Sequence, residues 1–306
     1  MRQAFAAVGL IVLGFLAACG GGPVTEVVPS PPVTPPPPVT QPAWSSAFGS
    51  DSSGYYADLT VSGNSLIAVQ RFRRVAPGTF LMGSPTGEVG RDTDEVQHAV
   101  TLTTACWIAD SECSQRLWKA VMNTNPAYHQ APAIATTDLD LPVESVSWND
   151  TQTFVTALNA AKPGLFARLP SEAEWESAAR AGTTTPFSVA PVDTVNINCY
   201  PIAIDPYVAS GTYRIQTVKV ASLAVNPWAM YGVHGNVGEW VLDLYAADLG
   251  TAAVTDPFGP GTGPGRVIRS GNWNAIGQNC RTAERSYLAA NQALNTVGFR
   301  LAVPAN

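Results

Sequence analysis

The chain has 306 residues, only 13% of them are charged, and the formal net charge is −6. Sparse and negative charge does not suit the phosphate backbone, so nucleic acid is excluded as an expected partner. The length is sufficient for one large buried core, and the 26 glycines and 25 prolines indicate a fold rich in loops.

The N-terminal segment has the pattern of an export signal. Arg2 precedes an apolar run over residues 4–16 that is too short to span a membrane. Residues 16–19 (LAAC) resemble the lipobox of bacterial lipoproteins, which implies cleavage before Cys19, acylation of its thiol and, with Gly20 next, delivery to an outer membrane. We therefore expect a cell-envelope lipoprotein that contacts the membrane through this lipid. The alternative is an ordinary secretory signal in which Cys19 has no role.

Residues 20–43 form a proline-dense segment without apolar periodicity. Proline fixes the backbone φ and removes the amide donor, so we expect an extended spacer with a rise of about 3.1 Å per residue. Proline-rich stretches are also ligands of small recognition domains, but a stalk is favoured in an exported protein. The domain organisation expected next is a short extension over residues 44–71 and one domain over residues 72–306.

Three elements are predicted in the first part of this domain. Residues 100–108 (VTLTTACWI) are rich in β-branched and aromatic side chains and are typical of a strand. Residues 114–122 place four apolar side chains on one helical face behind a serine cap. A second helix is expected to begin near Asn149.

The clearest local signal is a capping box at Ser171 and Glu174, in which each side chain satisfies a free amide of the first helical turn. The helix that follows turns Trp175 and Ala178 inward. Gly182 is its expected C-terminal stop.

Beyond this helix the helical periodicity disappears. Short strand-like runs, such as residues 266–271 and 297–303, alternate with Gly, Asn and Pro turns. This pattern predicts a mixed α+β fold with much irregular backbone.

Seven segments of the chain recur together, in the same order, in one known family. They are GTFLMGS (78–84), HAVTLT (98–103), LPVESVSWND (141–150), RLPSEAEWESAARAG (168–182), GVHGNVGEW (232–240), RVIRSGNW (266–273) and VGFRLA (297–302). They resemble the sulfatase-modifying-factor family, the domain of formylglycine-generating enzyme. Because they span nearly all of residues 72–303, chance is a poor explanation. The resemblance implies a loop-rich variant of the C-type lectin fold.

The resemblance also bears on copper. Oxidising members of the family hold copper with two cysteines after an RxxRGGSW motif, because soft thiolates suit monovalent copper. Here residues 274–279 read NAIGQN and supply neither thiolate. The family places a structural half-cystine at Cys280, whose usual partner position is Ala178 or Ala179 here. We therefore expect no bound copper, no catalytic residue of the oxidase type, and a structural or free Cys280.

Residues 235–239 (GNVGE) resemble the calcium loop of the family, although Gly238 departs from its pattern. Asn236 and Glu239 offer hard oxygen ligands, and Asn226 offers another. One expectation is therefore a calcium ion held by Asn226, Asn236 and Glu239. The other is an Asn-Gly turn in which Glu239 pairs with an arginine.

Four cysteines remain besides Cys19, which permits two disulfides with three possible connectivities in an exported protein. Cys106 and Cys113 stand where the family usually has core apolar residues. This suggests a disulfide between them and leaves Cys199 to pair with Cys280. Disulfide geometry is strict enough to forbid either pairing.

A second branch of this lectin-like family keeps the frame, lacks the copper cysteines and binds ligands through its C-terminal segment. The variable proteins of diversity-generating retroelements belong to it, and their fixed and changeable runs resemble this chain from Arg266 onward. The changeable runs correspond to residues 274–279 and 286–295. The ligand contacts that the resemblance implies are Trp273, Asn274, Ile276, Gln278, Asn279, Tyr287 and Asn291.

Such side chains suit an adaptable contact surface, because Tyr and Trp supply rigid area and Asn supplies hydrogen bonds. Many of them can arise by adenine changes in an asparagine codon, but Gln278 and Gln292 cannot come from a codon ending in cytosine. The alternative is an ordinary, invariant surface loop.

The leading hypothesis is an exported, lipid-anchored domain that binds an unidentified protein or glycan through its C-terminal segment and has no copper oxidase activity. A second hypothesis is an enzyme of the family, such as a periplasmic maturation factor, that acts by another route. A third is a subunit of an envelope complex, which would co-purify with fixed partners.

Overall fold

The structure, a computed structural model, describes residues 38–130 and 139–305. The predicted signal peptide, Cys19 and residues 20–37 of the predicted spacer lie outside the described residues. A compact unit from Thr40 to Asn306 holds every strand and helix discussed below. No helix in the described part of the chain is long and apolar enough to cross a membrane.

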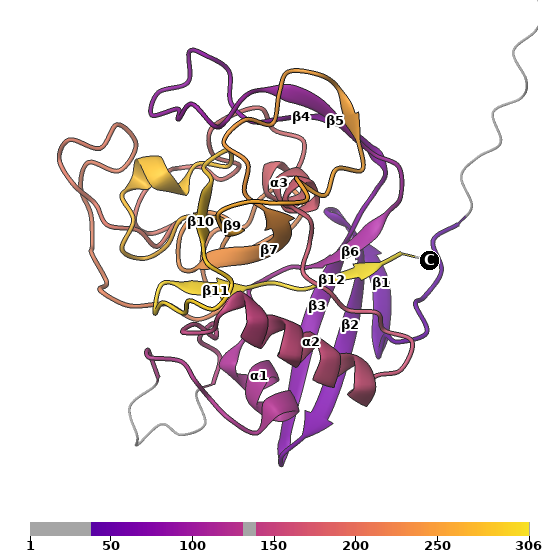
Figure 1. Ribbon diagram of the computed structural model, residues 1–306. Coiled ribbons are helices and arrows are strands. Elements are labelled where there is room, and N and C mark those ends of the chain that lie inside the picture. The colour runs from indigo at the N-terminus through magenta and orange to yellow at the C-terminus, as the bar shows by residue number, and fades with distance from the viewer. Residues whose placement is uncertain (1–37, 131–138, 306) are drawn as a thin grey trace, which may run out of the picture. The chain divides into compact units, whose positions relative to one another are not determined.

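An antiparallel sheet of five strands forms one side of this unit (Figure 1). Its order is β1 (Ala47–Asp51), β2 (Gly54–Gly63), β3 (Leu66–Val75), β6 (Cys106–Ala109) and β12 (Ala302–Pro304). The β2–β3 hairpin turns at Asn64 and Ser65, both with positive φ, as a two-residue loop that follows the strand twist requires. The domain boundary expected between residues 71 and 72 falls inside β3, so residues 47–71 are part of this sheet.

The other described strands form two smaller sheets. One has the order β10 (Ser286–Leu288), β9 (Arg266–Arg269), β7 (Gly238–Leu244) and β11 (Val297–Phe299). The other has the order β4 (Gly78–Met82), β5 (His98–Leu102) and β8 (Val254–Thr255). The C-terminal segment therefore pairs with β7, and the chain end then returns to the five-stranded sheet through β12.

Two runs that were predicted as single strands each divide between two sheets. The run at 100–108 becomes β5 and β6, because the backbone amide of Thr103 donates to Asp256 Oδ1 at 2.8 Å and the chain leaves the first sheet there. The run at 297–303 becomes β11 and β12 around Arg300, whose guanidinium is bound by buried Glu239. Alternation of side chains carries no information about which sheet a strand joins.

The α-helices of the described residues are α1 (Gln115–Met122), α2 (Trp148–Ala161) and α3 (Glu172–Arg180). Each begins behind a serine whose hydroxyl accepts a backbone amide of the first turn, which satisfies an otherwise free donor. The capping box predicted at Ser171 and Glu174 is confirmed. A second box at Ser147 starts α2 at Trp148, next to the predicted Asn149.

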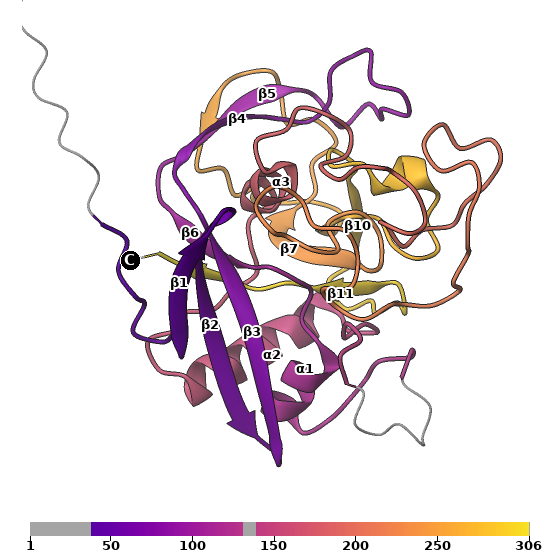
Figure 2. The same ribbon diagram turned by 180° about the vertical axis from the view of Figure 1, so that it is seen from behind.

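Helices α1 and α2 lie side by side against the five-stranded sheet (Figures 1 and 2), and α1 contacts β2 and β3. Helix α3 contacts β4, β7 and β9 instead. Trp175 of α3 is 1% exposed and packs with Ile108, Val241 and Val267 in one core cluster. Helix α3, whose first turn is acidic, therefore packs against β9, the first strand of the C-terminal segment (residues 266–305), and against β7, with which β9 pairs.

Candidate ligand-binding face

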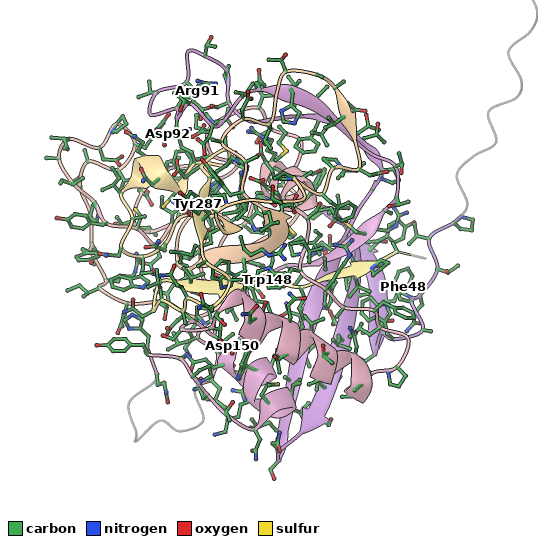
Figure 3. The ribbon with its side chains drawn as sticks, in the orientation of Figure 1. Phe48, Arg91, Asp92, Trp148, Asp150 and Tyr287 are labelled. Carbon is green, nitrogen blue, oxygen red and sulfur yellow. The ribbon has the colours of Figure 1, made fainter. Side chains whose placement is uncertain are left out.

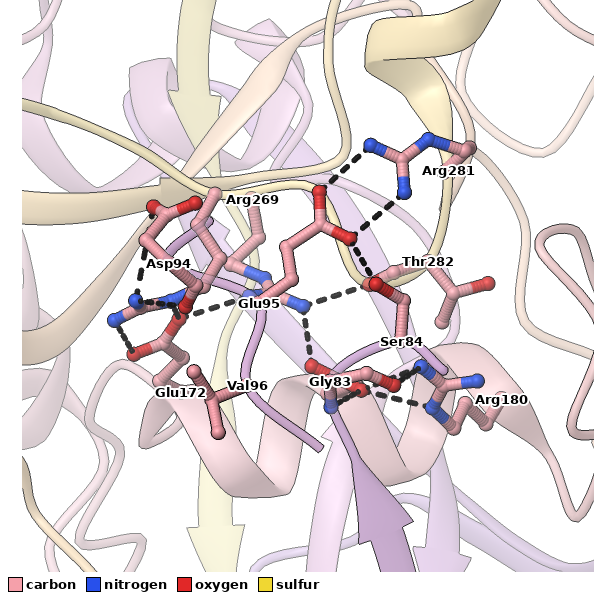
Figure 4. Close-up of polar contacts among 12 residues, drawn as sticks. Gly83, Ser84, Asp94, Glu95, Val96, Glu172, Arg180, Arg269, Arg281 and Thr282 are labelled. Carbon is pink, nitrogen blue, oxygen red and sulfur yellow. Dashed lines mark hydrogen bonds and ion pairs between the residues drawn. The ribbon is translucent and has the colours of Figure 1, made fainter. Parts of the chain in front are cut away.

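Buried arginines join the C-terminal segment to α3. Arg269, at the end of β9, donates to Glu172 at 2.8 Å and to Glu176 at 2.6 Å (Figure 4). Arg285 donates to the same Glu172 at 2.6 Å. Burial opposes ionisation of Glu172, but Arg285 and Arg269 hold its pKa below the usual value. One ionised carboxylate therefore links both sides of the segment to the helix.

Arg281 joins the segment to the loop between β4 and β5. Glu95 accepts two of its hydrogen bonds, at 2.6 and 2.8 Å (Figure 4). Glu88 accepts a third at 2.8 Å. Burial raises the pKa of Glu95, yet the hydrogen bonds from Arg281 and Ser84 lower it below its usual value. The side chains of Arg269, Arg281 and Arg285 thus hold the segment, and these three arginines with their buried carboxylate partners are called the frame below.

The loop after Trp273 is partly open to solvent. Asn274 is exposed, and its Oδ1 accepts a hydrogen bond from the Tyr213 hydroxyl at 2.5 Å. Ile276 is half-buried and forms an isolated bridge with Tyr200. These two predicted contacts therefore lie beside two tyrosines of the segment before β7.

The 3-10 helix η2 (Gly277–Cys280) follows this loop. Gln278 and Asn279 are half-buried in it. The backbone amide of Gln278 donates to Asp205 Oδ2 at 2.8 Å, and its side chain lies over Gly90. The backbone of η2 is therefore fixed, while both side chains remain partly accessible.

The candidate ligand-binding face consists of the accessible residues between Asn274 and Asn279 together with Tyr287 and Asn291. Tyr287, labelled in Figure 3, belongs to β10, is 44% exposed and stacks on Tyr245 with the ring centroids 4.4 Å apart. Asn291 is exposed in the loop after β10. Both side chains can reach a ligand without any change in the backbone.

Trp273 is a correction to the predicted set, because it is only 7% exposed. Its ring packs edge-on to His129 at 5.1 Å, and its Nε1 donates to the Asn295 carbonyl at 3.2 Å. Trp273 therefore supports the face from below rather than forming its surface.

The donors expected for calcium do not form one set. Glu239 accepts hydrogen bonds from Arg300 at 2.5 and 2.6 Å and from Trp175 Nε1 at 2.7 Å, which is the alternative of an arginine partner. Asn226 donates to the carbonyls of Ala178 and Ala179 at the end of α3. Neither side chain therefore fits the predicted calcium site.

Neighbouring oxygens around Asn236 fit a cation better. Asn236 Nδ2 donates to Glu112 Oε1 at 2.8 Å, and Asn236 Oδ1 accepts from Asn198 at 3.1 Å. Glu112 Oε2, Asn198 Oδ1 and Thr217 Oγ1 are buried without a hydrogen-bond partner. Burial raises the pKa of Glu112 to about 7. Unsatisfied carboxylate and amide oxygens are the ligands that a hard cation such as calcium takes.

The described cysteines Cys106, Cys113, Cys199 and Cys280 are buried free thiols. Cys106 packs in the core cluster of Ile108, whereas the Cys113 thiol points to the Ser114 carbonyl at 3.7 Å, so the expected bridge between them is wrong. Cys199 and Cys280 share a core cluster, and a hydrogen bond between their thiols, with burial, holds the pKa of Cys280 well above its usual range.

Sequence reasoning missed His129, Tyr200 and Tyr213. The rings of Tyr200 and Tyr213 are 4.7 Å apart, and Tyr213 stacks on Trp273 at 6.3 Å. The only available signal was two tyrosines in a stretch without periodicity. Their connection to the face is long-range pairing, which no local pattern reports.

Comparison with known proteins agrees with this geometry. The family described as "Sulfatase-modifying factor enzyme 1-like domain" matches residues 61–305. The chain is 31% identical to the formylglycine-generating enzyme of Thermomonospora curvata over 60% of its own length and 63% of that protein. It is 31% identical to the one from Streptomyces coelicolor over 59% of its length and 60% of that protein. The chain thus spans less than two thirds of these relatives.

Solved structures give the same fold. Treponema denticola variable protein 1 superposes with a TM-score of 0.65 at 26% identity, over 81% of this chain and 99% of that one. PvdO from Pseudomonas aeruginosa superposes with a TM-score of 0.63 at 24% identity, over 85% of this chain and 98% of that one. The predicted α+β fold of the C-type lectin-like type is confirmed.

Proposed function

The chain belongs to the sulfatase-modifying factor enzyme 1-like family, and we propose that it is a ligand-binding module of the cell envelope without copper oxidase activity. The observation that carries the proposal is the composition of the loop after Trp273. Residues 274–279 contain no cysteine. The nearby Cys280 is fully buried with a raised pKa, so it is a poor source of the thiolate that copper needs.

The proposed contact surface consists of Asn274, Ile276, Gln278, Asn279, Tyr287 and Asn291. Its ligand is a protein or a glycan, since rigid tyrosines and adaptable amides suit either. The first four of these residues lie between the buried Arg269 and Arg281, and Tyr287 and Asn291 follow the buried Arg285. A change of contact residues therefore leaves the frame in place, as a diversified binding protein requires.

Two assays test the proposal. A copper-loaded sample is incubated with a cysteine-containing sulfatase peptide, beside a formylglycine-generating enzyme as the positive control. We expect no formylglycine by mass spectrometry, and oxidation of the peptide would contradict the proposal.

The second assay screens glycan and protein arrays with the full chain and with Asn274→Ala/Tyr287→Ala/Asn291→Ala. We expect the triple variant to lose the bound ligand. The matched control changes exposed residues of the five-stranded sheet, Tyr55→Ala/Ile67→Ala/Val69→Ala. Equal loss in both variants would contradict the assignment of the face.

We further propose that calcium binds beside Asn236, held by oxygens of Glu112, Asn198 and Thr217. A bound calcium ion would add positive charge beside the buried Glu112 carboxylate, on which only the more distant Arg300 acts now among the described residues. Calcium should raise the melting temperature of the wild type but not of Glu112→Gln. A calcium effect that persists in this variant and disappears in Glu239→Gln would contradict this site and support the one predicted from the sequence, with Asn226, Asn236 and Glu239 as ligands.

The localisation proposed with this function is the outer membrane, with a lipid on Cys19. Metabolic labelling with a palmitate analogue should mark the wild type and not Cys19→Ser. Label in both would exclude this thiol as the attachment point.

The alternative function is a modifying enzyme that acts without the cysteine pair. It is favoured by the 31% identity to two formylglycine-generating enzymes. Formylglycine formed by the copper-free protein, and retained in Cys199→Ser/Cys280→Ser, would support it over the binding module.

A further inference from the structure

A pocket lies apart from the candidate face, between the first turn of α3 and the loop that follows β7. It has a volume of about 470 Å³, and none of its lining residues comes from residues 270–298. Met82 lies on its inner wall, and Leu249, Val254 and Phe258 are contributed by the loop and β8. The walls are therefore largely apolar.

Asp243 lines this pocket, is only 3% exposed and forms no ion pair with an arginine or lysine of the described residues. Its Oδ2 accepts the backbone amide of Glu172, the first residue of α3, at 2.7 Å. No described residue donates a hydrogen bond to its Oδ1. One carboxylate oxygen is therefore fixed by the helix while the other is available to a ligand.

His98 adds a second acceptor. Its Nδ1 lies 2.9 Å from the Val96 carbonyl, so a hydrogen atom must sit on Nδ1. In the neutral ring Nε2 is then an acceptor, and no described residue donates to it. Since His98 lines the pocket, its free nitrogen complements the same kind of group as Asp243.

The charge of the lining is negative. Asp243 and Asp248 are present, and none of the described lining residues is a lysine or an arginine. Glu172 also lines the pocket, but its carboxylate is already paired with Arg269 and Arg285. The remaining charge and acceptors complement a cationic group with several N–H donors, and the apolar walls complement carbon.

We propose that this pocket binds a primary amine with a short apolar body, whose ammonium group donates to Asp243 and His98 while its carbon chain packs between Met82 and Phe258. The amine is either a free small molecule or the side chain of a lysine. This assignment is independent of the ligand on the candidate face, because the two sites share no contact residue.

Protonation of Asp243 provides a signature of such binding. Burial and the negative charge of Glu172 raise the pKa of Asp243 to about 7, Glu174 raises it further, and Arg285 opposes them. His98 and Asp248 also line the pocket, and Arg266 is attracted to Asp243. An ammonium ligand favours the ionised acid, so binding releases a proton, and affinity falls by about tenfold for each pH unit below 7.

The test is calorimetric titration of the full chain with benzylamine, and with benzyl alcohol and benzoate as neutral and anionic matches. We expect benzylamine to bind at least tenfold more tightly than either match at pH 8, with proton release at pH 7. Asp243→Asn keeps an acceptor for the Glu172 amide and removes the charge, so it should weaken benzylamine at least tenfold. Asp58→Asn, the same change in β2 and remote from the pocket, should leave binding unaltered.

Equal binding of benzyl alcohol, undiminished binding to Asp243→Asn, or no heat with millimolar benzylamine would overturn the proposal. A circular dichroism spectrum and a melting curve of Asp243→Asn confirm that a lost signal is not lost folding. Nα-acetyl-lysine methylamide then separates the two sources. If it binds more tightly than benzylamine, the ligand is a lysine side chain, and if it binds more weakly, the ligand is a free amine.

Discussion

Glu239 and Arg300 are fully buried partners, and each is the main neutralising charge of the other. Removal of one member leaves an uncompensated charge in the core, which typically costs about 3–5 kcal/mol. We expect Glu239→Gln to lower the free energy of unfolding by about that amount in urea titrations.

The matched control for Glu239→Gln is Asp58→Asn. Asp58 pairs with Arg71 near the surface, where the arginine side chain is 39% exposed. A pair of this kind contributes about 1 kcal/mol or less. If both variants lose the same stability, the buried pair between Glu239 and Arg300 contributes no more than a surface pair.

Glu284 makes stability depend on pH. Burial and the negative charge of Glu95 raise its pKa from 4.5 to about 8, while Arg281 opposes the shift. A raised acid pKa gives stability that is fully present below pH 4.5 and is lost as the pH rises through 8, at about 1.4 kcal/mol per unit at most. Glu284→Gln should therefore flatten the decline between pH 5 and about 8 and stabilise the protein at the upper end.

Glu95→Gln is the opposite control, measured by the same urea titrations across pH. The pKa of Glu95 is lowered, so its contribution is present above pH 4.5 and lost in acid. Its substitution removes the ionic partner that accepts two hydrogen bonds from Arg281 and leaves Glu88 and Glu284, so it should destabilise the protein at neutral pH. A pH profile unchanged by Glu284→Gln would show that this carboxyl titrates normally.

Motifs in the sequence predicted where individual functional residues lie but not what those residues do. Asn274, Tyr287 and Asn291 are exposed as a contact surface requires, whereas Trp273 is buried. Glu239 resembled a calcium ligand and is an arginine partner. A motif identifies an oxygen, but the partner of that oxygen depends on residues that are distant in sequence, here Arg300.

At the scale of elements, the end of α3 offers a paired test. Ala181, the C-cap, has a φ of 48° and is left-handed, although it carries a Cβ. That conformation costs a non-glycine residue about 1–2 kcal/mol. Ala181→Gly should therefore raise the unfolding free energy by roughly 1 kcal/mol, and Ala178→Gly, inside the helix, should lower it by a similar amount. Destabilisation in both variants would mean that the Ala181 methyl group packs more favourably than its backbone is strained.

Helix starts were more predictable than strands, and the reason is physical. A capping box is a local hydrogen-bond exchange, so Ser171 and Glu174 specify it within four residues. The partition of residues 100–108 depends on Asp256, and the partition of residues 297–303 depends on Glu239. The sheet that a strand joins therefore depends on contacts with residues that are distant in sequence.

The fold class could be predicted from seven separated segments of the sequence, whereas the N-terminal strands were not predicted. Residues 47–71 match none of those segments, yet they form β1, β2 and most of β3. The pocket proposed to bind an amine was not predicted from the sequence either, because its lining residues Met82, His98, Asp243 and Phe258 come together only in the folded chain.

The buried ion pairs of the frame and the accessible side chains of the candidate face should differ in how much substitution they tolerate. A library randomised at Asn274, Ile276, Gln278, Asn279, Tyr287 and Asn291 changes side chains that are exposed or half-buried. A matched library randomised at Arg269, Arg281, Arg285, Glu95, Glu172 and Glu176 changes a buried ion network.

Displayed on cells and sorted for resistance to protease, the first library should retain a large fraction of folded members and the second almost none, because each broken buried pair costs about 3–5 kcal/mol of a total near 5–15. Similar survival of the two libraries would remove the physical basis for a diversified face. In natural populations, the same division predicts substitutions confined to codons 270–298 that spare Arg281 and Arg285, together with a nearby template copy and a reverse transcriptase. A uniform segment without a template would indicate a binding module of fixed specificity. The tolerance of its candidate face to substitution would then follow only from the buried ion pairs that hold the backbone.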